Sequence, residues 1–318
     1  MLTFEQIHDA KRRISSYIYE TPIIRLNGLD QLLGCHVYIK AENLQKTNSF
    51  KLRGALNKML SMPLEQLQKG VVAASSGNHG KGVAYAAKLL NSKATIVLPD
   101  SAPSIKVEGI LALGAEVVQC KLAERHVLTE KLSRDYGYCN IHPYDDYDIM
   151  AGQGTAGLEI VTQLPEVDTI VVPIGGGGLI SGVATAVKSM APHINVIGVE
   201  PAVVSRYTKS IEAGERLLLA EQKSLADALR TLQPGERNFP IVQQLVDDVV
   251  SVDEVMIQRG MKTLISEGKI IAEPSSSIGI GAALQGALPI RKNEKVCFLI
   301  SGGNVGLEAL DKKASTQI

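Results

Sequence analysis

Short apolar runs alternate with longer segments of helical periodicity along most of the chain. In the helical segments 79–91, 104–112 and 152–164, apolar residues recur three or four positions apart. The apolar runs between such segments are rich in valine and isoleucine, which is typical of buried strands. We expect strands at 37–41, 70–74, 94–98, 115–119, 169–173, 195–199 and 296–300.

This alternation predicts an α/β fold class with mainly parallel sheets. Most predicted strands end in glycine or polar residues, and ligands of doubly wound sheets bind at the carboxyl ends of the strands. The stretch 64–140 follows Pro63 and has a strand–helix alternation of its own. We therefore expect a small domain at 64–140, inserted into a large domain that is formed by 1–63 and 141–318.

Composition and charge exclude several classes of partner. The 33 basic residues balance the 33 acidic ones, aromatics are only 4% and tryptophan is absent. This balance favours neither nucleic acid nor an anionic membrane. The segment 1–16 has no apolar signal core, and no stretch approaches the roughly 20 apolar residues of a spanning helix. We expect a cytoplasmic protein with no nucleic-acid partner and no membrane partner.

Cysteine and histidine show no spacing that is typical of metal ligands. The six histidines are dispersed, and neither CxxC nor HExxH occurs. We expect reduced thiols at Cys35, Cys120, Cys139 and Cys297. A Gly-x-Ser-x-Gly elbow is also missing, so serine hydrolysis has no support.

The first segment that suggests chemistry is AENLQKTNSFKLRGA, residues 41–55. Within it, Lys51 follows Phe50 at the start of a predicted helix. The helix dipole disfavours an ammonium ion there, which lowers the lysine pKa and aids imine formation. The alternative is a surface lysine beside Ser49, with Ser49 capping the helix.

Two further segments lie between a predicted strand and a predicted helix. Residues 75–80, SSGNHG, offer hydroxyls, an amide and backbone N–H groups to an anion or a carboxylate, although a simple helix cap is an alternative. Residues 175–178 are four consecutive glycines, each about 0.5–1 kcal/mol less favourable than alanine. Such a loop predicts close approach of backbone N–H groups to a phosphate. It lacks the Walker and GxGxxG patterns, which disfavours ATP and dinucleotides.

The last segment is SGGN, residues 301–304, which follows the predicted strand 296–300. The hydroxyl of Ser301 would lie at the carboxyl end of that strand, where it could bond a heterocycle nitrogen. A plain turn explains the segment equally well.

Together with YDDYDIMAGQGTAGLE at 144–159, these segments resemble the fold-type II pyridoxal-phosphate enzymes, in their threonine/serine dehydratase and serine racemase branch. SFKLRGA, SSGNHG, GGGGL and SGGN are specific only in combination, and they span nearly the whole chain. The resemblance implies two doubly wound parallel-sheet domains with the cofactor, pyridoxal 5'-phosphate, between them. It also implies a homodimer.

The resemblance assigns cofactor contacts to particular residues. Lys51 would carry the cofactor as an imine and act as the base on one of its faces, and Phe50 would pack against the pyridine ring. Asn78 would hold the ring hydroxyl, and Ser301 would bond the pyridine nitrogen. The phosphate would be bound by the backbone N–H groups of Gly175, Gly176, Gly177, Gly178 and Leu179.

The resemblance also implies contacts with an amino-acid substrate, whose carboxylate would be held by Ser75, Asn78 and His79. Ser76 stands where dedicated threonine dehydratases have alanine. In enzymes of the racemase type, a hydroxyl at this position serves the face opposite the lysine. Ser76 is therefore a second candidate catalytic residue.

One departure from the family pattern concerns a metal. Racemases of this branch typically bind a divalent cation through a Glu, a backbone carbonyl and an Asp six residues after the Glu. Glu200 matches the Glu, but the Asp position holds Arg206, which argues against a cation there.

The expected activity is that of an ammonia-lyase, or dehydratase, which converts L-threonine, L-serine or a related β-hydroxy amino acid to a 2-keto acid and ammonia. A neutral serine at the pyridine nitrogen would keep that nitrogen unprotonated, which favours elimination over transamination. A serine racemase with side β-elimination and a 3-hydroxyaspartate dehydratase remain alternatives. The chain ends soon after residues 301–304, so we expect no C-terminal regulatory domain and no feedback by isoleucine.

Overall fold

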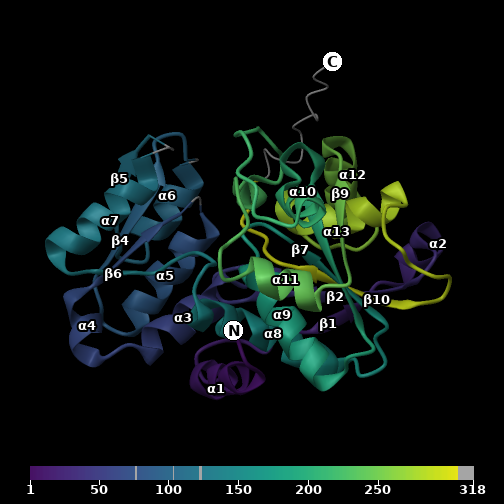
Figure 1. Cartoon of the computed structure of the whole chain (residues 1–318), viewed down its shortest axis with the longest axis horizontal. Coiled ribbons are helices and arrows are strands. Elements are labelled where there is room, and N and C mark those ends of the chain that lie inside the picture. The colour runs from purple at the N-terminus through teal and green to yellow at the C-terminus, as the bar shows by residue number, and fades with distance from the viewer. Residues whose placement is uncertain (76, 103, 122–123, 307–318) are drawn as a thin grey trace.

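The structure, a computed structural model, describes residues 1–75, 77–102, 104–121 and 124–306, and within them the strands form a large and a small sheet (Figure 1). The large sheet has the order β1 (Ile23–Arg25), β2 (His36–Ala41), β10 (Lys295–Ile300), β7 (Thr169–Pro173), β8 (Asn195–Pro201) and β9 (Asp248–Val252). The small sheet has the order β5 (Glu116–Cys120), β4 (Ala94–Pro99), β3 (Val71–Ala74) and β6 (Cys139–Asn140). The strand pairs are parallel except β1 with β2, so the predicted α/β fold class is confirmed.

Helices cover the faces of both sheets, as parallel sheets require. In Figure 1 the small sheet and its helices lie on the left and the large sheet lies on the right. The helices are α1 (Phe4–Ile14), α2 (Asp30–Leu33), α3 (Lys51–Ser61), α4 (Leu64–Lys69), α5 (Asn78–Leu89), α6 (Ser104–Leu111), α7 (Arg125–Tyr136), α8 (Tyr147–Gln163), α9 (Gly178–Met190), α10 (Arg206–Ala213), α11 (Phe239–Leu245), α12 (Glu254–Ser266) and α13 (Pro274–Gln285). None of the described helices has the length and apolar character needed to cross a membrane.

Each strand that the sequence predicts is present, whereas β1, β6 and β9 were not predicted. Strands β1 and β6 have three and two residues, which is too short for a recognisable alternation. Strand β9 lies at the edge of the large sheet, and its first residue is exposed. An edge strand buries less apolar surface, so its sequence carries a weaker hydrophobic signal.

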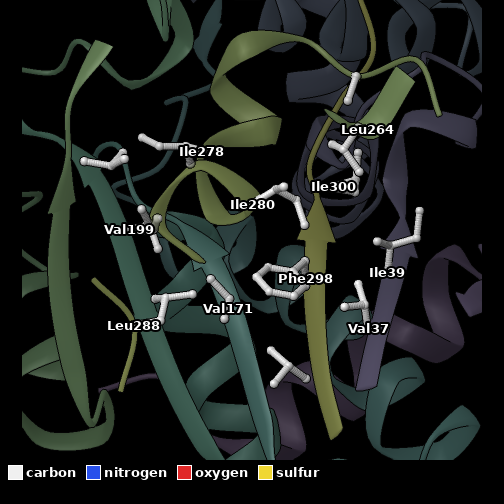
Figure 2. Packing of buried hydrophobic residues seen from close by; sticks show 14 of the residues in the cluster. Val37, Ile39, Val171, Val199, Leu264, Ile278, Ile280, Leu288, Phe298 and Ile300 are labelled. Atoms are coloured by element: carbon white, nitrogen blue, oxygen red, sulfur yellow. The ribbon is translucent and has the colours of Figure 1, made fainter. Parts of the chain in front are cut away.

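Strand β10 is buried on both faces and anchors the centre of the large sheet. On one face, Phe298 lies between Val171 of β7 and Ile39 of β2, with Ile280 of α13 next to it (Figure 2). On the other face, Cys297 belongs to a separate apolar cluster that includes residues of α8 and α9. This two-sided packing holds the carboxyl end of β10 in place.

The glycines of α8 serve close helix packing. A Cβ at Gly152 would meet the carbonyl oxygen of Arg53 in α3 at 2.6 Å, and a Cβ at Gly154 would meet that of Gly182 in α9 at 2.8 Å. Contacts below 3.0 Å force a shift of the backbone, so no larger residue fits. The GQGTAG part of the segment 144–159 therefore brings α8 against α3 and α9.

Four buried charges tie α3 to β2 and α8. The Arg53 guanidinium donates to Glu42 at 2.7 and 2.8 Å and to Glu159 at 2.6 and 2.7 Å. Lys40 donates to Glu159 at 2.6 Å, and all four side chains are at most 4% exposed. Two cations thus balance two carboxylates, as burial of charge requires. Because Arg53 lies in the first turn of α3, this cluster also fixes the position of Lys51.

We predict that Arg53→Met lowers the free energy of unfolding by about 3–5 kcal/mol, because it leaves two buried carboxylates, Glu42 and Glu159, with Lys40 as the one remaining cation of the cluster. Arg12→Met is the control, since Arg12 is largely exposed and its ion pair in the described part of the chain is with Asp9. It should change stability by no more than about 0.5 kcal/mol. Urea unfolding measures both, and equal losses in the two variants would contradict the role of the cluster.

Candidate active site

Segments that are far apart in sequence meet at the carboxyl ends of β2, β10 and β7. Phe50 N donates to the carbonyl of Ser301 at 3.0 Å, and Ser49 forms an isolated β-bridge with Gly302. From the small sheet, α5 brings Asn78 to the same place, where its side chain accepts from Asn304 Nδ2 at 2.9 Å. The motifs singled out in the sequence therefore lie together.

Lys51 is the first residue of α3, as predicted, and its side chain is half-buried. Its Nζ donates to the carbonyl of Pro143 at 2.6 Å and lies 5.0 Å from the centre of the Phe50 ring. Burial lowers the lysine pKa to about 8, although the charge of Glu273 acts in the opposite direction. A considerable fraction of this amine is therefore neutral near pH 7–8. The alternative, a surface lysine beside a serine that caps the helix, is wrong, because Ser49 is buried and the N-cap of α3 is Phe50.

Ser301 follows β10 and belongs to a pair of neutral hydroxyls. Its Oγ lies 2.9 Å from Ser276 Oγ, and Ser276 Oγ also accepts from Gly302 N at 2.7 Å. Ser276 can therefore donate its own proton to Ser301. In that arrangement Ser301 keeps its hydroxyl proton for an external acceptor.

The glycine loop that follows β7 offers a row of backbone donors. No acceptor among the described residues takes the N–H groups of Gly175, Gly176, Gly177, Gly178 and Leu179. The loop leads directly into α9, whose N-terminal dipole favours an anion. This arrangement is suited to a phosphate group.

Tyr144 explains why side chains are excluded from part of this loop. A Cβ at Gly176 would overlap the Tyr144 ring, and a Cβ at Gly178 would meet Tyr144 Cα at 2.9 Å. On the other side, a Cβ at Gly177, where φ is +105°, would overlap the hydroxyl of Tyr207. The loop is therefore held between two tyrosines that the sequence analysis did not single out.

The turn before α5 combines a cap with free donors. Ser75 Oγ accepts from Gly77 N at 2.9 Å and from Gly80 N, in the first turn of α5, at 2.7 Å, although the N-cap of the helix is Gly77. The N–H groups of Asn78 and His79 have no acceptor among the described residues. A carboxylate could bind to both. Ser76 lies outside the described residues.

The His79 ring has no N–H group left to donate to a substrate. Its Nε2 lies 2.7 Å from the carbonyl oxygen of Ile141, which can only accept, so Nε2 carries the proton. Burial lowers its pKa to about 3, and the ring is therefore neutral. Nδ1 is buried, has no partner among the described residues and is an acceptor. A carboxylate would consequently be held by the backbone N–H of His79 rather than by its ring.

Asn78 is held in a chain of polar side chains. It donates to Glu273 Oε1 at 2.6 Å and accepts from Asn304, which in turn accepts from Lys81 at 2.7 Å. Glu273 is 4% exposed, and burial raises the pKa of its carboxyl to about 7. Sequence reasoning missed Glu273. The only available signal was its position before Pro274, which is typical of the residue preceding a helix.

Glu200 and Arg206 lie next to each other and are fully buried. Arg206 Nη1 is 3.6 Å from Glu200 Oε2, and Glu200 also accepts from Tyr207 N and from Thr208 N. Among the described residues, no group of three or more His, Cys, Asp or Glu side chains could hold a metal ion.

The comparisons with known proteins agree with this geometry. The chain belongs to the pyridoxal-phosphate-dependent enzymes, whose family model matches residues 14–302. It is 40% identical over 316 residues to a serine racemase of Dictyostelium discoideum, covering 98% of this chain and 97% of that one. It is 39% identical over 318 residues to an L-threonine ammonia-lyase of Thermotoga maritima, covering 98% of this chain and 78% of that one.

Solved structures show the same fold. Maize serine racemase matches with a TM-score of 0.93 and 38% identity, covering 97% of this chain and 95% of that one. A processed threonine deaminase of Solanum lycopersicum matches with a TM-score of 0.91 and 38% identity, covering 96% of this chain and 91% of that one. The predicted resemblance and the fold-type II architecture are thereby confirmed, and the chain is a pyridoxal-phosphate-dependent enzyme.

The donors of the site fit this cofactor chemically. A half-buried amine with a lowered pKa suits imine formation, and the free amides of the glycine loop suit a phosphate. The Ser301 hydroxyl suits an unprotonated ring nitrogen, since it can donate to a lone pair.

We predict that Gly176→Ala strongly weakens binding of pyridoxal phosphate, because the added methyl group overlaps the Tyr144 ring and must displace it or the loop. Gly175→Ala is the matched control, since its Cβ would find its nearest atom at 3.4 Å, an ordinary contact. Absorbance titration of the apoenzyme with the cofactor compares the two. Similar affinities in the two variants would show that Tyr144 does not restrict the loop.

Proposed function

We propose that this enzyme is an ammonia-lyase, or dehydratase, which converts L-threonine, L-serine or a related β-hydroxy amino acid to a 2-keto acid and ammonia. The observation that carries the proposal is the joint presence of the Lys51 amine and the neutral Ser301–Ser276 hydroxyl pair at one sheet edge. Relatives named L-threonine ammonia-lyase and L-threonine dehydratase support it, at 39–40% identity.

In the proposed site, each cofactor contact has its own residue. Lys51 carries the cofactor, Phe50 packs against the pyridine ring and Asn78 holds the ring hydroxyl. Ser301 bonds the ring nitrogen. The phosphate is bound by the backbone amides of Gly175, Gly176, Gly177, Gly178 and Leu179. These assignments are supported by the amides that lack acceptors and by the side-chain contacts that orient Asn78.

Bound pyridoxal phosphate supplies an electron-withdrawing group that makes the substrate's α-proton acidic. Lys51 takes that proton, and its lowered pKa places it near the value a base needs at neutral pH. The β-hydroxyl would leave as water by taking up the proton that Lys51 has removed, and a second water would hydrolyse the unsaturated amine that remains to the 2-keto acid and ammonia. Ser301, being neutral, leaves the ring nitrogen unprotonated, which disfavours transamination.

The substrate's carboxylate binds at the N-terminus of α5. The free amides of Asn78 and His79 donate to it, and the helix dipole adds favourable charge. The hydroxyl of Ser75, whose oxygen already accepts two N–H groups, still has its proton to donate.

A serine racemase with side β-elimination is the second candidate function, and 3-hydroxyaspartate dehydratase is a variant of the first. Relatives named serine racemase, at 38–40% identity, favour the racemase alternative. A substrate panel of L-serine, D-serine, L-threonine and 3-hydroxyaspartate, scored for both keto acid and the product of inversion at the α-carbon, tests the proposal. Racemisation that exceeds keto-acid release on every substrate would overturn the ammonia-lyase assignment in favour of the second candidate.

We also infer the wider organisation of the enzyme. The division into a small domain at 64–140 and a large domain at 1–63 and 141–318 is supported by the small sheet, whose strands β3 to β6 all come from residues 71–140. A homodimer acting on a small amino acid is supported by the family resemblance, and a cytoplasmic location by the four cysteines, which are free thiols. No divalent cation is proposed at Glu200, because Arg206 is its neighbour.

We predict that Lys51→Ala abolishes turnover and leaves the fold intact, because imine formation and proton removal both need this amine. Lys46→Ala, five positions earlier in the same segment, is the control and should keep full activity. Keto-acid release measures turnover, and borohydride reduction of the parent followed by peptide mapping locates the cofactor. A label on a lysine other than Lys51 would exclude the assignment.

We predict that Ser76→Ala removes racemisation and any turnover of D-serine, while elimination from the L-substrate is retained. Lys51 reaches one face of the substrate, so inversion needs a second acid on the other face. A purely capping serine would instead cost about 0.5–2 kcal/mol of stability and leave the partition between reactions unchanged. Chiral product analysis decides between the two roles, and equal proportional losses in both reactions would refute the two-face role.

A further inference from the structure

Arg206 and Tyr207, the first two residues of α10, bond the carbonyl groups of the glycine loop. Arg206 Nη2 donates to Ile174 O at 2.5 Å, and its Nε donates to Gly175 O at 3.0 Å. The Tyr207 hydroxyl donates to Gly176 O at 2.9 Å. Three successive carbonyl groups are therefore directed towards α10, and both side chains that hold them are fully buried.

Glu200, at the end of β8, positions the start of α10. Its carboxylate accepts from Tyr207 N at 3.0 Å, from Thr208 N at 2.8 Å and from Thr208 Oγ1 at 2.8 Å. A carboxylate at a helix N-terminus is stabilised by the helix dipole. Through this cap, β8 holds α10 in place, and α10 holds the loop.

The direction of the carbonyl groups determines the direction of the amides. In a planar trans peptide the C=O and the N–H of the next residue point in opposite directions. Because the carbonyls of Ile174, Gly175 and Gly176 face α10, the N–H groups of Gly175, Gly176 and Gly177 face away from it. These three are among the amides that lack an acceptor within the described part of the chain.

We propose that Arg206 is a positioning residue that orients the amides of the glycine loop towards the cofactor phosphate and acts as a permanent internal cation behind them. The inference rests on the proposed function, because it takes Gly175–Leu179 as the phosphate site. The charge of Arg206, which Glu200 at 3.6 Å offsets in part, adds to the dipole of α9, and both favour a dianion on the amide side of the loop.

The same contacts make the loop independent of a divalent cation. Arg206 Nη1 donates to Val204 O at 2.6 Å and lies 3.6 Å from Glu200, so the guanidinium already occupies the space between these oxygens. A hard cation needs oxygen ligands, and the oxygens of Val204 and Glu200 already face the guanidinium. Unlike a bound ion, the guanidinium cannot be removed by a chelator.

The test compares pyridoxal phosphate with pyridoxal, which lacks the phosphate, in absorbance titrations of the full-chain apoenzyme. The parent should prefer the phosphorylated form. In Arg206→Met this preference should fall by about 10- to 100-fold, the size expected when hydrogen bonds to a charged group are lost. Arg206→Lys keeps the charge but can bond fewer carbonyls, so its preference for the phosphorylated form should lie between those of the parent and of Arg206→Met.

Two further variants guard against a folding defect. Tyr207→Phe removes only the bond to Gly176 O and should lower the preference by several-fold. Arg25→Met is the control, since Arg25 also bonds a carboxylate and a backbone carbonyl but lies on β1, an edge strand of the sheet. It should leave the preference unchanged.

The outcomes separate this inference from the function on which it rests. A parent that binds both compounds equally would overturn the phosphate site itself, and with it the role of Arg206. A parent that prefers the phosphate, with folded Arg206 and Tyr207 variants that keep the full preference, would overturn the role of Arg206 alone. A shift in the parent's melting temperature or cofactor affinity on adding magnesium or chelator would overturn the claim of cation independence.

Discussion

Parallel pairing of β2, β10 and β7 is the constraint on which the site depends. Parallel neighbours end at the same edge of a sheet, so the segments that follow these strands must meet there although they are far apart in sequence. Lys51, Ser301 and the glycine loop lie at one edge of the large sheet for this reason. The pairing is maintained because β10 is packed on both faces and because the buried charges around Arg53 fix the start of α3.

The carbonyl groups and the amide groups of the glycine loop face opposite sides. Its carbonyl groups are bonded to Arg206 and Tyr207 at the start of α10, and its amides remain without acceptors among the described residues. Glycine is needed there for steric reasons, because Tyr144 lies against Gly176 and Gly178 where side chains would be. A loop with side chains would have to move away from one of its neighbours, and the row of amides would be lost.

The fold and the local motifs could be predicted because their signals lie in continuous sequence. Seven strands, the start of α3 at Lys51 and the glycine loop all follow from hydrophobic runs and glycine spacing. Glu273, Tyr144 and Tyr207 could not be found in this way, since each reaches the site through packing between distant segments. The same applies to the His79 ring, whose donor is used by Ile141 O, a partner that sequence does not reveal.

Charge in the proposed site is arranged in layers, and this arrangement suits the chemistry. The groups assigned to the cofactor's ring and phosphate are neutral: a serine hydroxyl, an asparagine amide and backbone N–H groups. The ionisable groups lie behind them, with Glu273 bonded to Asn78 and Arg206 bonded to the glycine loop. A carboxylate in place of Ser301 would hold a proton on the ring nitrogen and favour transamination. Glu273 instead bonds Asn78 and orients it. The partner of Ser301 is Ser276, so no carboxylate is bonded to the hydroxyl that is assigned to the ring nitrogen. The neutral inner layer therefore favours elimination, and the outer layer of ionisable groups keeps it in position.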